Sequence, residues 1–262
     1  MNKLLTGLLG SAAALTGVLS GVSPAAAFTW DNSWSQSPIL SKAQTGFDDA
    51  PFQAFVQPER MEMVNVGQFL LDPTKLKLKQ DYEVKVHFIN EGAGFRNQLA
   101  YQATGAINSS GLVFDDVSSP WEGGLQYGDA VSLGTLKAGT QLDFWLRANG
   151  KNGGTNIFGT NTASNEDGLQ HVFAAAYKNY LVLGFEDLYG ALGAWGQDAK
   201  TGKWNESSDR DFNDAVVVVD LGEKNVHALT SVPEPSMTLG LMSVGAVGLM
   251  GLRRRQNKAA RQ

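Results

Sequence analysis

The sequence contains no cysteine, only three histidines, and few stretches with the spacing of an amphipathic helix. Without cysteine the chain forms no disulfide bonds, although a body of this length can bury an adequate core without them. The histidines at positions 87, 171 and 227 lack the spacing of zinc ligands, so we expect a structural role for each. The sequence also lacks a nucleophile elbow, a phosphate-binding loop and a zinc motif. The sequence therefore has none of the commonest enzyme signatures.

The first 27 residues have the pattern of a secretory signal peptide. Lys3 precedes an apolar run over residues 4–22, and small residues end the segment at Ala27. This arrangement predicts cleavage after Ala27 by signal peptidase. A membrane anchor is the alternative, but the small-residue site is clear and no charge follows the run to stop transfer.

The other end of the chain has one long uncharged stretch, residues 237–252, which is followed directly by Arg253, Arg254 and Arg255. Its 16 residues are slightly fewer than the roughly 17–25 needed to span a bilayer. The arginines would stay in the cytoplasm, which leaves the main body outside. A buried core helix is the alternative, but it would not normally end in a basic cluster at the chain terminus. We therefore expect a transmembrane helix over residues 237–252.

The order of these features resembles the PEP-CTERM sorting signal of Gram-negative bacteria. Pro233, Glu234 and Pro235 stand before the apolar stretch, and the arginine cluster stands after it, so residues 232–258 carry all three parts. The resemblance implies recognition by a membrane exosortase and cleavage near the Pro-Glu-Pro triplet. It further implies release or attachment at the cell surface, often in association with exopolysaccharide.

Basic residues are scarce in the body between the two signals. Of the 21 lysines and arginines, six lie in the terminal segments, which leaves 15 against 26 acidic residues and a formal charge of −11 for residues 28–235. Nucleic-acid binding requires clustered Lys and Arg to neutralise phosphates, so this class is excluded. The acidic balance suits a soluble surface protein or one that binds cations.

The body has the pattern of short strands separated by glycine-rich turns, which predicts an all-β fold, either a β-sandwich or a jelly roll. Val216–Val219 form a β-branched run unsuited to a helix. The expected domain covers residues 56–225, between a loosely ordered segment (28–55) and a linker (226–235). The strands are expected at residues 61–69, 81–90, 98–103, 111–114, 131–136, 141–150, 180–185 and 214–221.

Acidic residues gather at the ends of two of these strands. If residues 180–185 and 215–219 pair as antiparallel neighbours, the end of the first strand adjoins the start of the second. Crowded carboxylates repel one another unless one is protonated or a cation joins them. Ca²⁺ takes six to eight oxygen ligands, which this inventory can supply. The candidate metal ligands are Glu186, Asp187, Asp209, Asp211, Asn213 and Asp214.

These acidic residues allow two other interpretations. An EF-hand is excluded, because Asp214 occupies the position that requires glycine and a strand follows instead of a helix. A polar hairpin with solvated carboxylates, each bonded to nearby backbone N–H groups, stays open.

The same two stretches resemble a bacterial family, the domain of unknown function family 4114. The resemblance rests on Gly-Phe-Glu-Asp at residues 184–187 and Asp-x-Asp-Phe-Asn-Asp at residues 209–214, and it covers residues 138–222. It implies a β-rich, surface-attached domain that binds calcium through the six candidate ligands. The connection between the motifs, residues 189–208, is longer than the family pattern. It contains Trp195 and Trp204, which could contact glycans or pack in the structure.

These observations predict an exported, non-enzymatic, calcium-binding protein of the cell surface or extracellular matrix. One alternative is a module that binds carbohydrate or exopolysaccharide through Trp195 and Trp204. Another is a glycoside hydrolase that uses Glu186 and Asp214 as its carboxylate pair. Asp167, in a second acidic loop, could add a metal ligand, but a solvated turn is the expectation there.

Overall fold

The computed structural model describes residues 28–62, 70–122 and 124–231. The predicted signal peptide, the sorting signal with its transmembrane helix, and most of the strand expected at residues 61–69 lie outside these ranges. The chain divides into two compact units, residues 1–30 and 31–262, and all elements named below belong to the second. In the described part of the chain, no helix is both long enough and apolar enough to cross a membrane.

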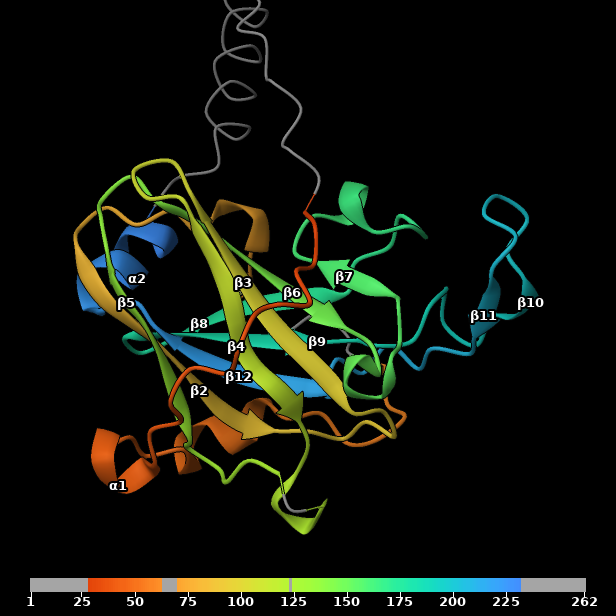
Figure 1. Ribbon diagram of the computed structural model, residues 1–262, viewed down its shortest axis with the longest axis horizontal. Helices are drawn as coiled ribbons and strands as arrows, with labels where there is room; N and C mark the ends of the chain where they lie inside the picture. The colour runs from red at the N-terminus through yellow and green to blue at the C-terminus, as the bar shows by residue number, and fades with distance from the viewer. Residues whose placement is uncertain (1–27, 63–69, 123, 232–262) are drawn as a thin grey trace, which may run out of the picture. The chain divides into compact units, whose positions relative to one another are not determined.

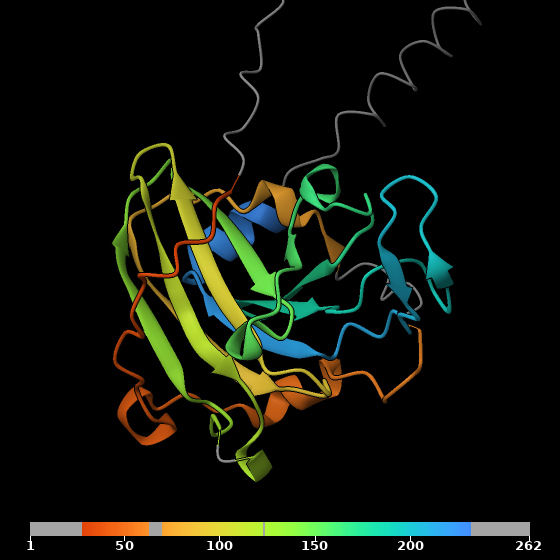
Figure 2. The same cartoon turned by 45° about the vertical axis from the view of Figure 1, so that its right-hand side comes forward.

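The described residues are mostly β-strand, which confirms the all-β class (Figures 1 and 2). One antiparallel sheet has the order β1 (Leu70–Leu71), β8 (Val172–Tyr177), β9 (Tyr180–Phe185), β12 (Ala215–Asp220), β2 (Tyr82–Asn90) and β5 (Ala130–Leu136). A second has the order β4 (Ser109–Val117), β3 (Asn97–Thr104), β6 (Gln141–Arg147) and β7 (Ile157–Gly159). A separate hairpin joins β10 (Trp195–Gln197) to β11 (Trp204–Glu206).

The two larger sheets share one hydrophobic core. Phe88 of β2, Phe114 of β4 and Phe144 of β6 are fully buried in it. Alternate side chains of each strand point toward this core because successive residues of a strand face opposite sides. Figure 1 shows β3, β4 and β6 lying across the strands of the larger sheet.

The run of valines in β12 is explained by burial on both faces. Val217 and Val219 belong to the core between the sheets, whereas Val216 and Val218 belong to a second cluster on the outer face of the larger sheet. A strand at the centre of a sheet with both faces covered reads as a continuous apolar run. β12 is therefore held firmly between β9 and β2.

The outer face is covered by the N-terminal segment, which has more regular structure than the loose order expected for residues 28–55. It forms α1 (Lys42–Thr45) and the 3₁₀ turn η1 (Ala50–Phe55). Phe47 and Phe52 are buried there, and the Phe47 ring stacks on His87 with centroids 3.9 Å apart. This contact buries His87, which the alternation of β2 placed on an exposed face.

The remaining elements connect the strands or close the ends of the sheets. The sequence predicts a linker from residue 226, but α2 (Glu223–Thr230) spans this position and Val226 is buried in the main core. In the described ranges, the other short 3₁₀ turns are η3 (Pro73–Lys75), η4 (Pro120–Glu122), η5 (Gly150–Asn152) and η6 (Thr162–Ser164).

Candidate metal centre

The pairing of β9 with β12 brings the two acidic stretches together, as the sequence predicts. The strands run antiparallel with Phe185 opposite Ala215. Glu186 directly follows β9, and Asp214 directly precedes β12, so both lie at the same end of the sheet. Because β12 continues as a strand, the exclusion of an EF-hand holds.

Three carboxylates converge at this end of the sheet. Glu186, Asp211 and Asp214 each place one oxygen within 4.8 Å of the other two. Oxygens on one calcium ion lie up to about 5 Å apart, because each Ca–O distance is about 2.3–2.6 Å. A single cation could therefore contact all three residues. These side chains are buried, at 0%, 1% and 8% exposure, which contradicts the alternative of a solvated hairpin.

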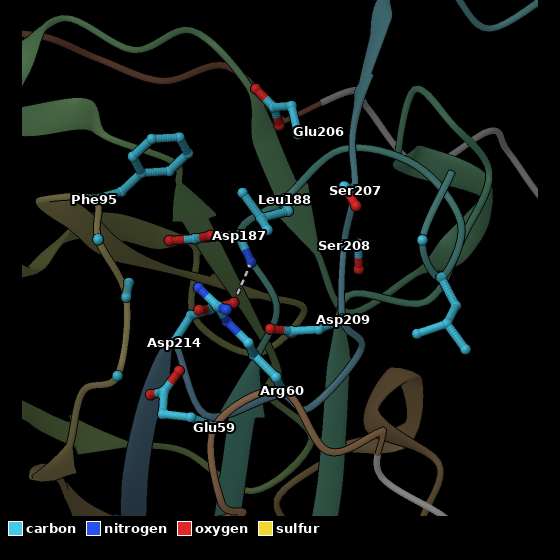
Figure 3. Close-up of a pocket in the computed structure, with 15 residues that line it drawn as sticks. Glu59, Arg60, Phe95, Asp187, Leu188, Glu206, Ser207, Ser208, Asp209 and Asp214 are labelled. Carbon is cyan, nitrogen blue, oxygen red and sulfur yellow. Dashed lines mark hydrogen bonds between the residues drawn. The ribbon is translucent and has the colours of Figure 1, made fainter. Parts of the chain in front are cut away.

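The hydrogen bonds of the three carboxylates leave oxygen lone pairs available for a cation, because each carboxylate oxygen has two. Both oxygens of Asp211 accept backbone N–H groups, from Arg60 at 2.9 Å and from Asn213 at 3.0 Å. Asp214 Oδ2 accepts the N–H of Asp187 at 2.8 Å (Figure 3). Glu186 Oε2 is buried without a hydrogen bond of normal geometry among the described residues, and the Ser208 hydroxyl, which also lacks one, lies close enough to lower the pKa of Glu186. A buried carboxylate oxygen without a partner is costly, and a bound cation would remove that cost.

The electrostatics of the site also favour the binding of a cation. Burial, reinforced by neighbouring carboxylates, raises the pKa of Glu186 to about 7 and that of Asp187 to about 7. The same causes raise the pKa of Asp214 well above its usual range and also raise that of Asp211. A calcium ion would supply the positive charge that lets these groups ionise near neutral pH.

Of the other three predicted ligands, Asp187 and Asp209 fall outside this cluster, and Asn213 donates its backbone N–H to Asp211 within it. The Asp187 carboxylate accepts a hydrogen bond of 2.6 Å from Asn97 Nδ2 on β3, which links the two sheets. Asp209 lines an adjacent pocket. Asn213 Nδ2 donates to the Gln57 carbonyl at 3.0 Å. Gln57 and Arg60, which lie outside both sequence motifs, therefore also contact residues of the site.

The loop that carries the second motif has an unusual backbone. Ser207, Arg210 and Phe212 adopt positive φ angles of 60°, 58° and 58°, although none is glycine. Such conformations persist only where the surrounding structure holds them. Phe212 is buried against Phe173, and the Arg210 guanidinium lies 4.9 Å from the centre of the Phe212 ring. Packing therefore presets the loop that places Asp211.

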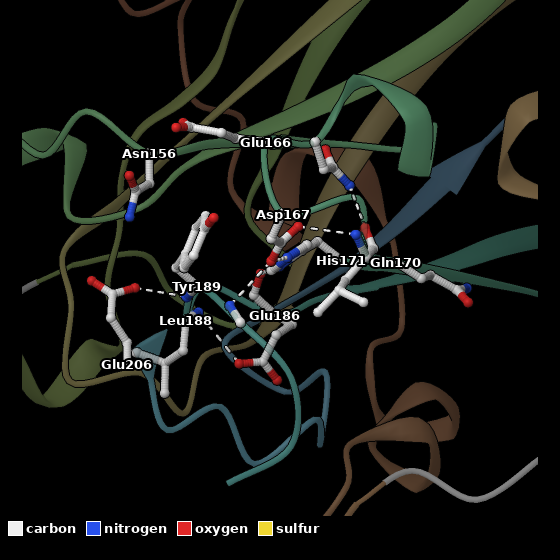
Figure 4. Close-up of polar contacts among 12 residues, drawn as sticks. Asn156, Glu166, Asp167, Gln170, His171, Glu186, Leu188, Tyr189 and Glu206 are labelled. Atoms are coloured by element: carbon white, nitrogen blue, oxygen red, sulfur yellow. Dashed lines mark hydrogen bonds and ion pairs between the residues drawn. The ribbon is translucent and has the colours of Figure 1, made fainter. Parts of the chain in front are cut away.

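The buried pair of Asp167 and His171 holds the backbone of the first motif at Glu186, and this contact is called the clamp below (Figure 4). His171 Nδ1 lies 2.9 Å from the Glu186 carbonyl, and the Glu186 N–H donates to the His171 carbonyl at 3.0 Å. His171 Nε2 lies 2.8 Å from Asp167 Oδ2. The clamp holds the backbone of Glu186 on both sides, which orients its carboxylate.

Asp167 is not the solvated residue that the sequence predicts, and it lies outside the three-carboxylate cluster. Its side chain is 3% exposed, and Oδ2 also accepts the N–H of Gly190 at 3.0 Å. Burial alone would raise the pKa of Asp167, but His171 and these hydrogen bonds lower it to about 2. The acidic loop thus supports the candidate site indirectly. No sequence signal separated this role from an ordinary turn.

A pocket of about 630 Å³ opens beside the cluster (Figure 3). Arg60 is the one basic residue among the described residues that line it, and Phe95, Leu188 and Leu192 contribute apolar surface. Its acidic lining residues are Glu59, Asp187, Glu206, Asp209 and Asp214. Of the three clustered carboxylates, only Asp214 faces this pocket, so Glu186 and Asp211 lie behind its wall.

The long connection between the motifs contains the β10–β11 hairpin. Trp195 and Trp204 are 78% and 61% exposed. Trp195 lies opposite Glu206, and Trp204 lies opposite Gln197. Since side chains alternate along a strand, both indoles project from the same face of the hairpin. Trp195 and Trp204 therefore do not pack in the core, which was one of the two roles considered for them from the sequence.

Comparison with known families agrees with this layout. Residues 136–222 match the family described as Domain of unknown function (DUF4114), and residues 231–255 match the PEP-CTERM protein-sorting motif. Searches of the curated proteins and of the solved structures found no match. The match to this family spans the three clustered carboxylates, and the PEP-CTERM motif that follows it implies an exported protein sorted by an exosortase.

Proposed function

We propose that this protein is a non-enzymatic β-sandwich of the cell surface or extracellular matrix, stabilised by calcium bound at the ends of β9 and β12. The observation that carries the proposal is the buried, unpartnered Glu186 Oε2, which lies in a cluster with Asp211 and Asp214. The shared core of the two sheets supports the sandwich description. Calcium is abundant outside cells and scarce in the cytosol, so the final stability would be reached only after export.

The donor set fits calcium better than a softer metal. All candidate ligands are carboxylate or amide oxygens, and oxygen is the ligand that Ca²⁺ prefers. Glu186, Asp211 and Asp214 would bind the ion directly, and the His171 clamp would keep Glu186 in place. The ion would supply charge neutralisation and a link between two chain segments that are distant in sequence.

Removal of calcium is expected to destabilise the protein. Calorimetry of the purified protein should give a Tm several degrees higher in about 1 mM calcium than in excess EDTA. A ligand at about 100 times its Kd adds about 2.7 kcal/mol to the free energy of unfolding. Magnesium at the same concentration is the control, because it prefers a smaller octahedral site. An unchanged Tm with no calcium uptake would contradict the proposal.

The geometry gives less support to a glycoside hydrolase. Glu186 and Asp214 place carboxylate oxygens within 4.8 Å of each other, but Asp211 shares the same space. Glu186 is fully buried and is not among the residues that line the pocket. A sugar would need access to both carboxylates from an open cleft. We therefore rank hydrolysis below calcium binding.

Carbohydrate binding is a second candidate, favoured by the two exposed indoles on one face of the β10–β11 hairpin. Exposed aromatic rings offer apolar faces on which sugars can stack. Replacing both Trp195 and Trp204 with alanine should reduce binding to exopolysaccharide fragments at least fivefold. Because the residues are exposed, the free energy of unfolding should change by less than about 0.5 kcal/mol. Trp121→Ala, at an exposed indole elsewhere, is the control. Glycan binding that survives the double substitution would remove this candidate surface.

A further inference from the structure

A second pair of oxygens meets beside the three-carboxylate cluster, between residues that are far apart in the sequence. A Cβ atom added to Gly92 would lie 2.2 Å from Glu59 Oε1 and 2.4 Å from Asn213 Oδ1. The two oxygens are therefore no farther apart than the sum of these distances. This is within the span of about 5 Å that two oxygens on one calcium ion can reach.

The orientation of the Asn213 amide makes this contact informative. Its Nδ2 donates to the Gln57 carbonyl at 3.0 Å, so reversing the amide would set two acceptors against each other there. The opposite atom, Oδ1, is buried and has no hydrogen-bond partner among the described residues, and Asn213 is only 2% exposed. An orphaned acceptor thus faces a carboxylate, which is also an acceptor when ionised.

The chain segment of residues 57–60, called the strap below, is anchored on both sides of Glu59. Gln57 accepts the bond from Asn213, and the Arg60 N–H donates to Asp211 Oδ2 at 2.9 Å. Burial and the charges of Asp211 and Asp209 raise the pKa of Glu59, whereas the Arg60 charge and a hydrogen bond from the Asn213 side chain act against this rise. Two anchors therefore hold an acidic side chain against an unpaired oxygen in an acidic pocket.

We propose that Glu59 Oε1 and Asn213 Oδ1 bind a divalent cation such as Ca²⁺ between them, so that the strap closes onto the acidic loop through metal. Glu59 falls outside the three carboxylates that share one 4.8 Å cluster, and it lies upstream of the matched domain at residues 136–222. Because Gly92 has no side chain, both oxygens can lie this close to its backbone. This proposal rests on the proposed function in using calcium at the same end of the sheet.

The test compares Glu59→Gln with Glu62→Gln, which makes the same charge change at an exposed residue just beyond the strap. Glu59→Gln should weaken calcium binding about tenfold or more, the scale seen when a partner of a metal site is removed. It should also raise the Tm of the calcium-free protein, because the amide can donate to Asn213 Oδ1. Glu62→Gln should change neither quantity. A structural role for Glu59 without metal would not produce these opposite signs.

Trypsin provides a second readout, since the strap ends at Arg60. Calcium should slow cleavage after Arg60 in the wild type and in Glu62→Gln, but not in Glu59→Gln. Gly92→Ala, which fills the gap with a methyl group, should have the same effect as Glu59→Gln. If the wild type binds calcium and Glu59→Gln matches it in affinity and in protection, this inference is overturned while the proposed function stands. If the wild type takes up no calcium, the proposed function itself is wrong.

Discussion

Replacing Glu186 with glutamine is expected to abolish measurable calcium stabilisation and to raise the stability of the calcium-free protein. Glu186 offers the one buried carboxylate oxygen of the cluster that has no hydrogen-bond partner among the described residues. Glutamine keeps the shape and the acceptor for the Leu188 N–H, but it removes the charge. Its amide nitrogen can donate to the nearby carboxylates of Asp211 or Asp214.

The two effects have a common cause. With no metal bound, ionised Glu186 adds to the repulsion among buried carboxylates, so its neutral analogue relieves strain worth on the order of a few kcal/mol. With calcium present, the variant lacks a ligand, and the affinity should fall more than tenfold. Urea denaturation of both proteins, in EDTA and in calcium, measures the effects together. Glu62→Gln is the control for a change in net charge. A variant that is destabilised equally in both conditions would show that Glu186 has only a packing role.

The calcium-free protein is expected to lose stability as the pH rises from about 4.5 to above 7. Glu186 and Asp187 have folded-state pKa values raised to about 7, and that of Asp214 is also raised. Burial lowers the pKa of His87 to about 4, which acts in the opposite direction, but three raised carboxylates outweigh one histidine. The folded state therefore binds more protons than the unfolded chain across this range. Stability rises with pH only where the unfolded chain binds more protons, so here it must fall.

Below about pH 4 the trend reverses, because Asp167 behaves in the opposite way. Its pKa is lowered to about 2 in the folded state, so the stability it provides is lost as the pH falls toward that value. The calcium-free protein should then be most stable near pH 4–5. Saturating calcium should shift the optimum upward, because the metal competes with protons for the same oxygens. Denaturation curves from pH 3 to 8, with and without calcium, measure this. Stability of the calcium-free protein that rises steadily from pH 4.5 to 7 would contradict it.

The arrangement of the candidate site was predictable as far as strand pairing determines it. Residues 180–185 and 214–221 have clear strand patterns, and antiparallel pairing of successive strands places Glu186 beside Asp214. The burial of both faces of β12 was suggested by its unbroken valines. Local pattern therefore sufficed for two strands that each have a clear signal, although the β10–β11 hairpin separates them along the chain.

The contributions from distant segments could not be predicted in this way. Glu59 lies in an exposed Pro-Glu-Arg turn, and nothing in that composition indicates that it meets Asn213. Asp167 resembles any acid in a polar loop, yet it is buried against His171. Phe47 lies in a polar segment whose regular structure comes from packing on the outer face of the sheet. Each of these roles depends on tertiary contacts that leave no periodic signal.

The most direct measurement is a crystal structure of the protein grown in calcium, with anomalous scattering used to locate the ion. The account predicts a calcium ion bound directly by Glu186, Asp211 and Asp214, at about 2.3–2.6 Å from their oxygens. A well-ordered structure in saturating calcium, with these carboxylates bonded only to protein groups or to water, would contradict the account.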